Sequence, residues 1–195
     1  MTPTTKLEAV NIMLSTIGES PVNSLSSGLV DAELAETILD ATSKAVQSEG
    51  WNFNREQSFS VSPTLNGEIV VPLNTLRADA TYLANSKDLV QRGTRMYDKE
   101  NHTFNVGEAT KLDLVVELVF TDLPEVARRF IAIRSARIFQ DRLVGSDTLH
   151  GFNQQDEASA YFQLKEFEAD TEDFNIMDNY SVARVMDRAG TKRML

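Results

Sequence analysis

Residues 31–54, DAELAETILDATSKAVQSEGWNFN, decide how the chain is organised. Apolar residues recur at helical spacing through the first part of this stretch, which predicts an amphipathic helix over 31–49. Asp31 is expected to cap the helix with its carboxylate, and Gly50 to end it in a left-handed conformation. The helix then delivers Trp51 and Phe53 to the point where helical spacing stops. The predicted core stripe of this helix consists of Leu34, Ile38, Leu39, Ala41, Ala45 and Val46.

Beyond this point the sequence alternates as strands do. Phe59 and Val61 share one face of a predicted strand, and Asn66-Gly67 predicts a hairpin turn with both residues at positive φ. A return strand through 69–71 should follow. A second strand pair is predicted for DLVQRGTRMYD (88–98) and HTFNV (102–106), and a buried strand inside the sheet for LDLVVELVF (112–120). These patterns predict a small antiparallel β subdomain over 57–120.

Helical spacing precedes and follows the β region. A first helix is expected over 4–17, a third from Pro124 to about Val144 with Asp122 as its cap, and a fourth over 153–173. The predicted fold is therefore α+β: a bundle of about four helices with an inserted small antiparallel β subdomain and a C-terminal tail. The expected divisions are 1–56 and 121–175 for the helical body, 57–120 for the β subdomain and 176–195 for the tail.

Composition excludes several classes of protein. The 195 residues include no cysteine, so disulfides and thiolate metal sites are impossible. The net charge of −10, from 19 basic and 29 acidic residues, disfavours wrapping of nucleic acid, which needs phosphate neutralisation. No signal peptide and no membrane-spanning apolar run is recognised, so a soluble protein without membrane association is expected.

Motifs for catalysis are missing. The sequence has no phosphate-binding glycine loop and no G-x-S-x-G elbow, and neither His102 nor His150, expected in loops, lies in an H-E-x-x-H pattern. Carboxylates are abundant, and two suffice for glycoside hydrolysis. The adjacent pairs 156–157 and 172–173 point to different faces of a helix, however, which favours solvated acids. No catalytic residue, cofactor or metal ligand is therefore predicted.

The arginines of the third helix carry more information. Arg134 and Arg137 fall on its apolar side, and burying either one without a partner would be costly. Three alternatives remain open: an internal ion pair with the acidic helix, a bridge between subunits, or phosphate binding. The charge is uneven, with seven acids and one lysine in 154–174 but four basic residues and one aspartate in 181–195. Opposite patches could thus pair within the fold or between subunits. The candidate interface or assembly residues are Arg128, Arg134, Arg137, Arg142, Arg184, Arg188, Lys192 and Arg193.

An ordered set of motifs resembles a known family. These are AVNIMLSTIGESPVNSL (9–25), SEGWNFN (48–54), LVQRGTRMYD (89–98) followed by HTF (102–104), and LPEVARRFIAIRSARIFQDRLVGS (123–146). Together they resemble tail tubular protein A, the head-to-tail adaptor family of short-tailed bacteriophages, the podoviruses. The matching residues taken as fold and assembly positions are Ile17, Gly18, Glu19, Gly50, Trp51, Phe53, Arg128, Arg137 and Arg142.

The resemblance implies a structural virion protein and not an enzyme. It implies a dodecameric ring connecting the portal protein to the nozzle formed by tail tubular protein B, assembled in the host cytoplasm and kept in the phage tail. Double-stranded DNA would pass through this channel during genome ejection without specific binding, and acids are expected to dominate its lumen. The competing hypotheses are a carboxylate-based glycan hydrolase of the phage tail and a DNA-binding module. Gly50, Trp51 and Phe53 are predicted to form the structural junction between the helical body and the β subdomain.

Overall fold

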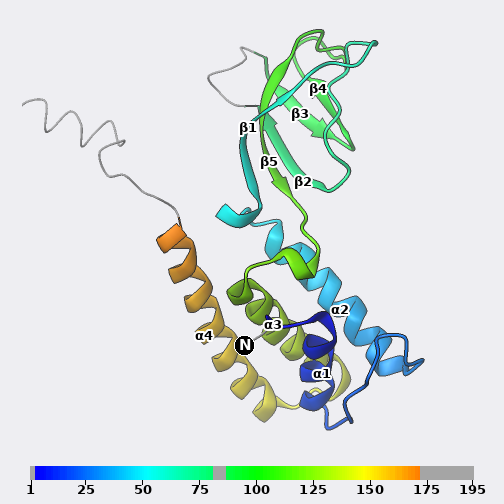
Figure 1. The fold of residues 1–195 in the computed structure, drawn as a ribbon, viewed down its shortest axis with the longest axis vertical. Coiled ribbons are helices and arrows are strands. Elements are labelled where there is room, and N and C mark those ends of the chain that lie inside the picture. The colour runs from blue at the N-terminus through cyan, green and yellow to red at the C-terminus, as the bar shows by residue number, and fades with distance from the viewer. Residues whose placement is uncertain (1–2, 81–86, 172–195) are drawn as a thin grey trace, which may run out of the picture.

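A helical bundle and a β subdomain lie end to end along the long axis of the molecule (Figure 1). The computed structural model describes residues 3–80 and 87–171. It confirms the predicted α+β class. In chain order the elements are α1 (Lys6–Thr16), α2 (Val30–Gln47), the 3-10 turn η1 (Asn52–Asn54), β1 (Arg55–Val61), β2 (Thr75–Ala80), β3 (Leu89–Arg92), β4 (Arg95–Asp98), β5 (Thr110–Val116), the 3-10 turn η2 (Phe120–Asp122), α3 (Glu125–Leu143) and α4 (Asp147–Thr171).

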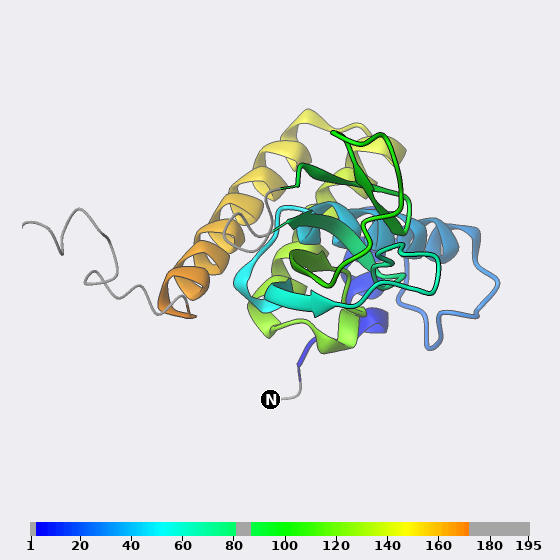
Figure 2. The same ribbon diagram turned by 90° about the horizontal axis from the view of Figure 1, so that it is seen from above.

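The bundle is organised around α3, which packs against α1, α2 and α4. In Figure 2, seen from above, α4 runs along one side of the bundle and α2 lies on the other. The helices enclose one apolar core, whose largest fully buried side chains include Phe130, Phe139, Met13 and Leu39. Thr5 and Glu8 form a reciprocal capping box at the start of α1. The core thus joins elements from both ends of the chain.

The predicted core stripe of α2 has the wrong phase. Ile38, Leu39 and Val46 are buried as expected, but Leu34, Ala41 and Ala45 are exposed. The predicted cap is also wrong: α2 begins at Val30 after Leu29, without a side-chain cap, and Asp31 lies in the first turn. In place of the exposed residues, the buried face includes Ala32, Ala35, Thr42, Ser43 and Gln47. Gly50 follows the helix at φ +81°, as predicted.

The sheet is antiparallel, with the strand order β1-β5-β2-β3-β4. As predicted, the apolar run after residue 110 forms an interior strand, because β5 pairs with β1 on one side and β2 on the other. This strand ends at Val116, earlier than predicted, and Phe120 belongs to η2. A second apolar core lies on one side of the sheet and contains Ile69, Val71, Ala78, Leu89, Met96, Val106, Leu112 and Leu114.

Several predicted hairpins are wrong. At Asn66-Gly67 only the glycine has positive φ, and the following residues form single bridges instead of a strand returning along β1. The stretch 88–98 is a hairpin by itself, since β3 and β4 fold back around Gly93. Residues 102–106 contribute only bridges at Thr103 and Asn105, and β2 was not predicted at all.

The boundaries of the last two helices differ from the prediction. Pro124 is the N-cap residue of α3, while Asp122 lies in η2 and makes no cap. The helix ends near Gly145, as predicted. The fourth helix begins at Asp147 and not at 153, so His150 lies within α4 and not in a loop. The predicted tail, 176–195, lies outside the described residues.

Candidate assembly surfaces

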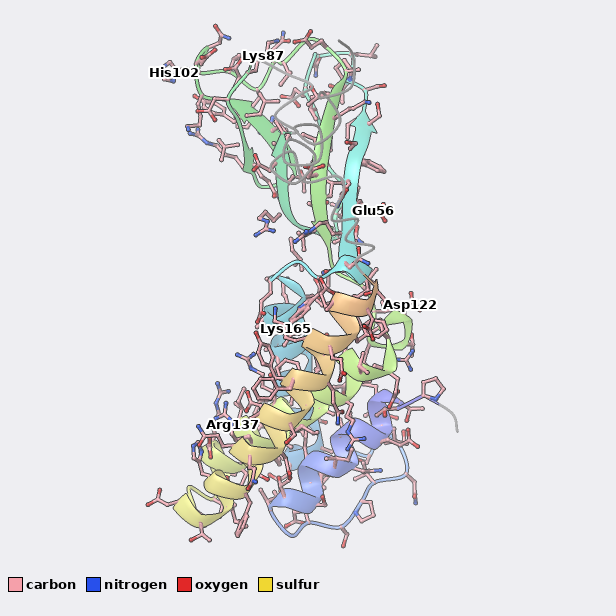
Figure 3. All side chains as sticks on the ribbon, turned by 90° about the vertical axis from the view of Figure 1, so that its left-hand side faces the viewer. Glu56, Lys87, His102, Asp122, Arg137 and Lys165 are labelled. Carbon is pink, nitrogen blue, oxygen red and sulfur yellow. The ribbon has the colours of Figure 1, made fainter. Side chains whose placement is uncertain are left out.

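Trp51 lies where the bundle meets the sheet and is almost completely buried, at 2% exposed. Its Nε1 donates to the Val46 carbonyl at 2.8 Å, so the polar edge of the ring is satisfied. Phe53 stacks parallel to it and Tyr161 of α4 meets it edge-on, each with ring centroids 6.4 Å apart. The ammonium of Lys165, labelled in Figure 3, lies 4.3 Å from the ring centroid. The tryptophan therefore connects the end of α2 to α4.

Two buried amide side chains hold the segment through which the chain returns from β5 to the bundle. Gln47 is fully buried: its Nε2 donates to the Leu118 carbonyl at 3.0 Å, and its Oε1 accepts from the Leu118 N–H at 2.7 Å. Asn54 Nδ2 donates to the carbonyls of both Gln47 and Val116, each at 2.9 Å. The segment after β5 is thus tied to the end of α2. Neither buried amide was predicted from the sequence. The one available signal was that Gln47 directly follows Val46, a residue of the predicted apolar stripe.

Gly50 lies close to side chains at the base of the sheet. A Cβ at this position would be 3.0 Å from both Arg77 Nη2 and Val115 Cγ2, and the backbone has positive φ. Arg55 Nη2 donates to the Gly50 carbonyl at 2.7 Å. A larger residue would strain the backbone and displace the base of the sheet. The three residues predicted to form the junction, Gly50, Trp51 and Phe53, thus lie where the bundle meets the sheet.

The end of α4 also contacts this junction. The Asn52 N–H donates to Glu168 Oε1 at 2.7 Å, and Asn52 Nδ2 donates to the Thr171 carbonyl at 3.1 Å. Since η1 leads directly into β1, the last turn of α4 supports the point where the sheet begins.

Arg134 and Arg137 meet the acidic helix within one chain. Arg137 Nε donates to Glu157 Oε2, and its Nη1 donates to Asp141 Oδ2 at 3.1 Å. The hydrogen bond that Arg137 donates to Glu157 raises the pKa of Arg137 against the opposing effect of burial. Arg134 lies 3.6 Å from Glu157 and 3.9 Å from Glu49, beside a cleft of about 410 Å³. Of the three alternatives for these arginines, the internal ion pair with the acidic helix is the one that the structure contains.

Asp141 extends this network to the start of α4. It accepts a hydrogen bond from Arg137, and its Oδ1 lies 2.9 Å from His150 Nδ1. The contact between Asp141 and His150 joins the C-terminal half of α3 to the first turns of α4. The labelled Arg137 lies beside α4 in Figure 3.

Arg128 binds backbone carbonyl groups. Its guanidinium donates to the carbonyls of Leu123 at 2.7 Å and Thr4 at 3.2 Å, and also to that of Thr121. It ties the N-terminal segment to the turn before α3. Arg142 is exposed near the end of the same helix. Arg184, Arg188, Lys192 and Arg193 lie outside the described residues, and the four candidates that are described do not share one site.

Within residues 3–80 and 87–171, no group of three His, Asp or Glu side chains could hold a metal ion. Of the predicted acid pair on α4, Glu157 is committed to Arg137, whereas Asp156 is exposed. No helix in this part of the chain combines the length and apolar character needed to cross a bilayer.

Comparison with known proteins identifies the class. A sequence model of the tail tubular protein family matches residues 7–174. The tail tubular protein A of Klebsiella phage KP34 is 31% identical over 163 residues, which cover 83% of this chain and 86% of that protein. The chain therefore belongs to the tail tubular protein family. It is a structural component of a bacteriophage tail and not an enzyme, which sets aside the glycan-hydrolase hypothesis.

Proposed function

We propose that this protein is the head-to-tail adaptor of its phage, a dodecameric connector ring on the portal vertex. One face of the ring would bind the portal protein and the other the nozzle made by tail tubular protein B. Assembly would take place in the host cytoplasm. The observation that carries the proposal is the family match, which spans both the bundle and the β subdomain.

The charge of the chain supports a passage for DNA. With a net charge of −10, a ring of identical subunits is strongly acidic, and an acidic lumen repels the phosphate backbone. Double-stranded DNA would then slide through without specific binding. A ring whose lumen was lined mainly by arginine and lysine would contradict this part of the proposal.

The proposal also assigns roles to the eight basic candidate residues and keeps the predicted division of the chain into helical body (1–56 and 121–175), β subdomain (57–120) and tail (176–195). Arg128, Arg134 and Arg137 already have partners within the chain, so their contribution would be to keep the subunit rigid. Arg142 is exposed and is proposed to contact a neighbour directly. The basic residues of 176–195 would bind an acidic surface of the portal or of the next subunit.

The test is portal capping. The full-length purified protein is mixed with portal rings of the same phage, and the products are imaged by electron microscopy. The expected result is one additional ring on the portal, which then recruits tail tubular protein B. Portal rings that stay uncapped at high protein excess would overturn the proposal. Monomeric behaviour without portal would not, because closure is expected to need that template.

A further inference from the structure

Among residues 3–80 and 87–171, nothing packs against the outer face of α4. Although α4 extends over Asp147–Thr171, Ala160 and Leu164 are its only buried residues. Its extensive contacts, within the described part of the chain, are with α3. Phe152 and Phe162 lie on the far side, with 65% and 71% of their surface exposed. Figure 3 looks onto this helix. Two phenylalanines so exposed on one helix mark an interaction surface.

A second unpartnered stripe follows α2. Val30, Leu34, Thr37, Ala41 and Ala45 recur every three or four residues and therefore share one side of the helix. All five are exposed, Val30 to 74%. The stripe contains no charged residue. From residue 37 onward its side chains are small, so the helix surface there is shallow.

The two faces lie on opposite flanks of the subunit. The central helix α3 separates α2 from α4, as Figures 1 and 2 both show. A ring of identical subunits needs this arrangement, because each contact joins one flank of a subunit to the opposite flank of the next. Two unpartnered faces on the same flank would instead favour a twofold dimer.

We propose that α4 of one copy packs along the α2 stripe of the next copy. This inference rests on the proposed ring and names the interface that closes it. The exposed ring of Phe162 fits the shallow surface over Ala41 and Ala45, since large residues pack best where the opposing helix carries small ones. Each phenylalanine would then lose most of its remaining contact with water.

Charge agrees with this pairing. Glu166 follows Phe162 by one helical turn, is exposed, and makes no ion pair with other described residues. Lys44 lies between Ala41 and Ala45 in the sequence, and its Nζ is only loosely paired, 3.6 Å from Glu117 Oε2. Placing Phe162 over the two alanines brings Glu166 within reach of Lys44 of the neighbour. Such a rim pair sets the register of the contact more than its strength.

Disulfide cross-linking tests the contact directly, because the chain has no cysteine of its own. Ala41→Cys and Ser159→Cys are combined in one full-length chain, which is mixed with portal rings and oxidised. Ser159 is exposed on the same side of α4 as Phe162, one turn away. The expected product is a ladder of cross-linked multimers on a non-reducing gel. The control combines Ser159→Cys with Arg129→Cys, an exposed position on α3, and should give no ladder.

Two outcomes separate this inference from the function on which it rests. If rings cap the portal but the α2–α4 pair gives no more cross-linking than the control, the interface is wrong while the adaptor function stands. If unmodified protein fails to cap the portal, the adaptor function fails and the interface fails with it.

Substitutions give an independent measurement. Phe162→Glu should reduce portal capping at least tenfold without changing the thermal unfolding midpoint, because the side chain is exposed in the subunit. Gln163→Glu adds the same charge at the next exposed position and should leave capping unchanged. Lys44→Glu and Glu166→Lys should each weaken capping, and the double variant should recover it. Equal capping by the Phe162→Glu and Gln163→Glu proteins would refute the proposed contact.

Discussion

Replacing Trp51 with alanine should destabilise the protein by about 3–5 kcal/mol, the usual cost of removing a core aromatic. A buried aromatic side chain removes roughly 150–250 Å² from water, equivalent to about 4–6 kcal/mol at 25 cal/mol per Å² as an upper bound. The substitution also leaves the Val46 carbonyl without its 2.8 Å hydrogen bond and removes both ring contacts, to Phe53 and Tyr161. For a chain of this size the thermal midpoint should fall by roughly 6–20 °C.

The assay is urea unfolding followed by the circular dichroism of the helices, since the variant lacks the only tryptophan fluorophore. Trp51→Phe keeps an aromatic ring but loses the hydrogen bond, so it should lose about 1–2 kcal/mol. Phe162→Ala removes an exposed aromatic and should change stability by less than about 0.5 kcal/mol. A loss below 1 kcal/mol for Trp51→Ala, with normal portal capping, would refute the role of this residue as the junction.

Three further predictions concern polar contacts. Gln47→Ala should cost about 2–4 kcal/mol in urea unfolding, because both backbone groups of Leu118 lose their partners; a cost under 1 kcal/mol would contradict this. A double-mutant cycle on Arg137 and Glu157, each changed to alanine, should give a coupling energy of about 1–2 kcal/mol, and additive losses would show the pair to be inert. Side-chain and backbone hydrogen bonds from the turn after β4 lower the pKa of Asp98. The contribution of Asp98 to folding stability is therefore fully present above its ordinary pKa of 3.8 and is lost as pH falls through the lowered pKa. Asp98→Asn should therefore flatten the fall in thermal midpoint in that acidic range, and an unchanged pH profile would count against it.

The phase of α2 shows what periodicity could not determine. Ile38, Leu39 and Val46 are compatible with two neighbouring stripes, one completed by Leu34, Ala41 and Ala45, the other by Ala32, Ala35, Thr42, Ser43 and Gln47. The first is more apolar and was chosen, yet the second is buried. Gln47 can be buried because the backbone of Leu118, distant in sequence, satisfies its amide. The identity of that partner is a property of the fold, and a window around α2 does not contain it.

The sheet likewise contains one strand that local sequence predicts and one that depends on a distant partner. The strand β5 was predicted because its β-branched residues suit an interior position whatever their neighbours are. In contrast, β2 has the sequence TLRADA, which has little strand propensity, and it is held by pairing with β5. Its existence depends on a partner more than thirty residues away in the sequence. Likewise, residues 88–98 were predicted to form one strand, although they form a hairpin that turns at Gly93.

The candidate residues were predictable in part. The apolar side of the third helix indicated that Arg134 and Arg137 need partners, and an internal ion pair with the acidic fourth helix was one of three alternatives; the structure contains such pairs with Glu157. The role of Arg128 was not predictable, because its three acceptors are carbonyls on two segments brought together only by folding. The exposed face of α2 was missed for a related reason: Leu34, Ala41 and Ala45, which lie on it, were predicted to belong to the core stripe.

The chain enters the β subdomain at Arg55 and leaves it after Val116, and Arg55 and Val115 are paired across neighbouring strands. The chain therefore crosses between the bundle and the sheet at two adjacent positions, already held at the spacing of a strand pair. Such a connection tolerates exchange of whatever lies beyond it. Loops at the far end of the sheet could be lengthened, shortened or replaced without moving the helices. One helical body could in this way carry different β subdomains.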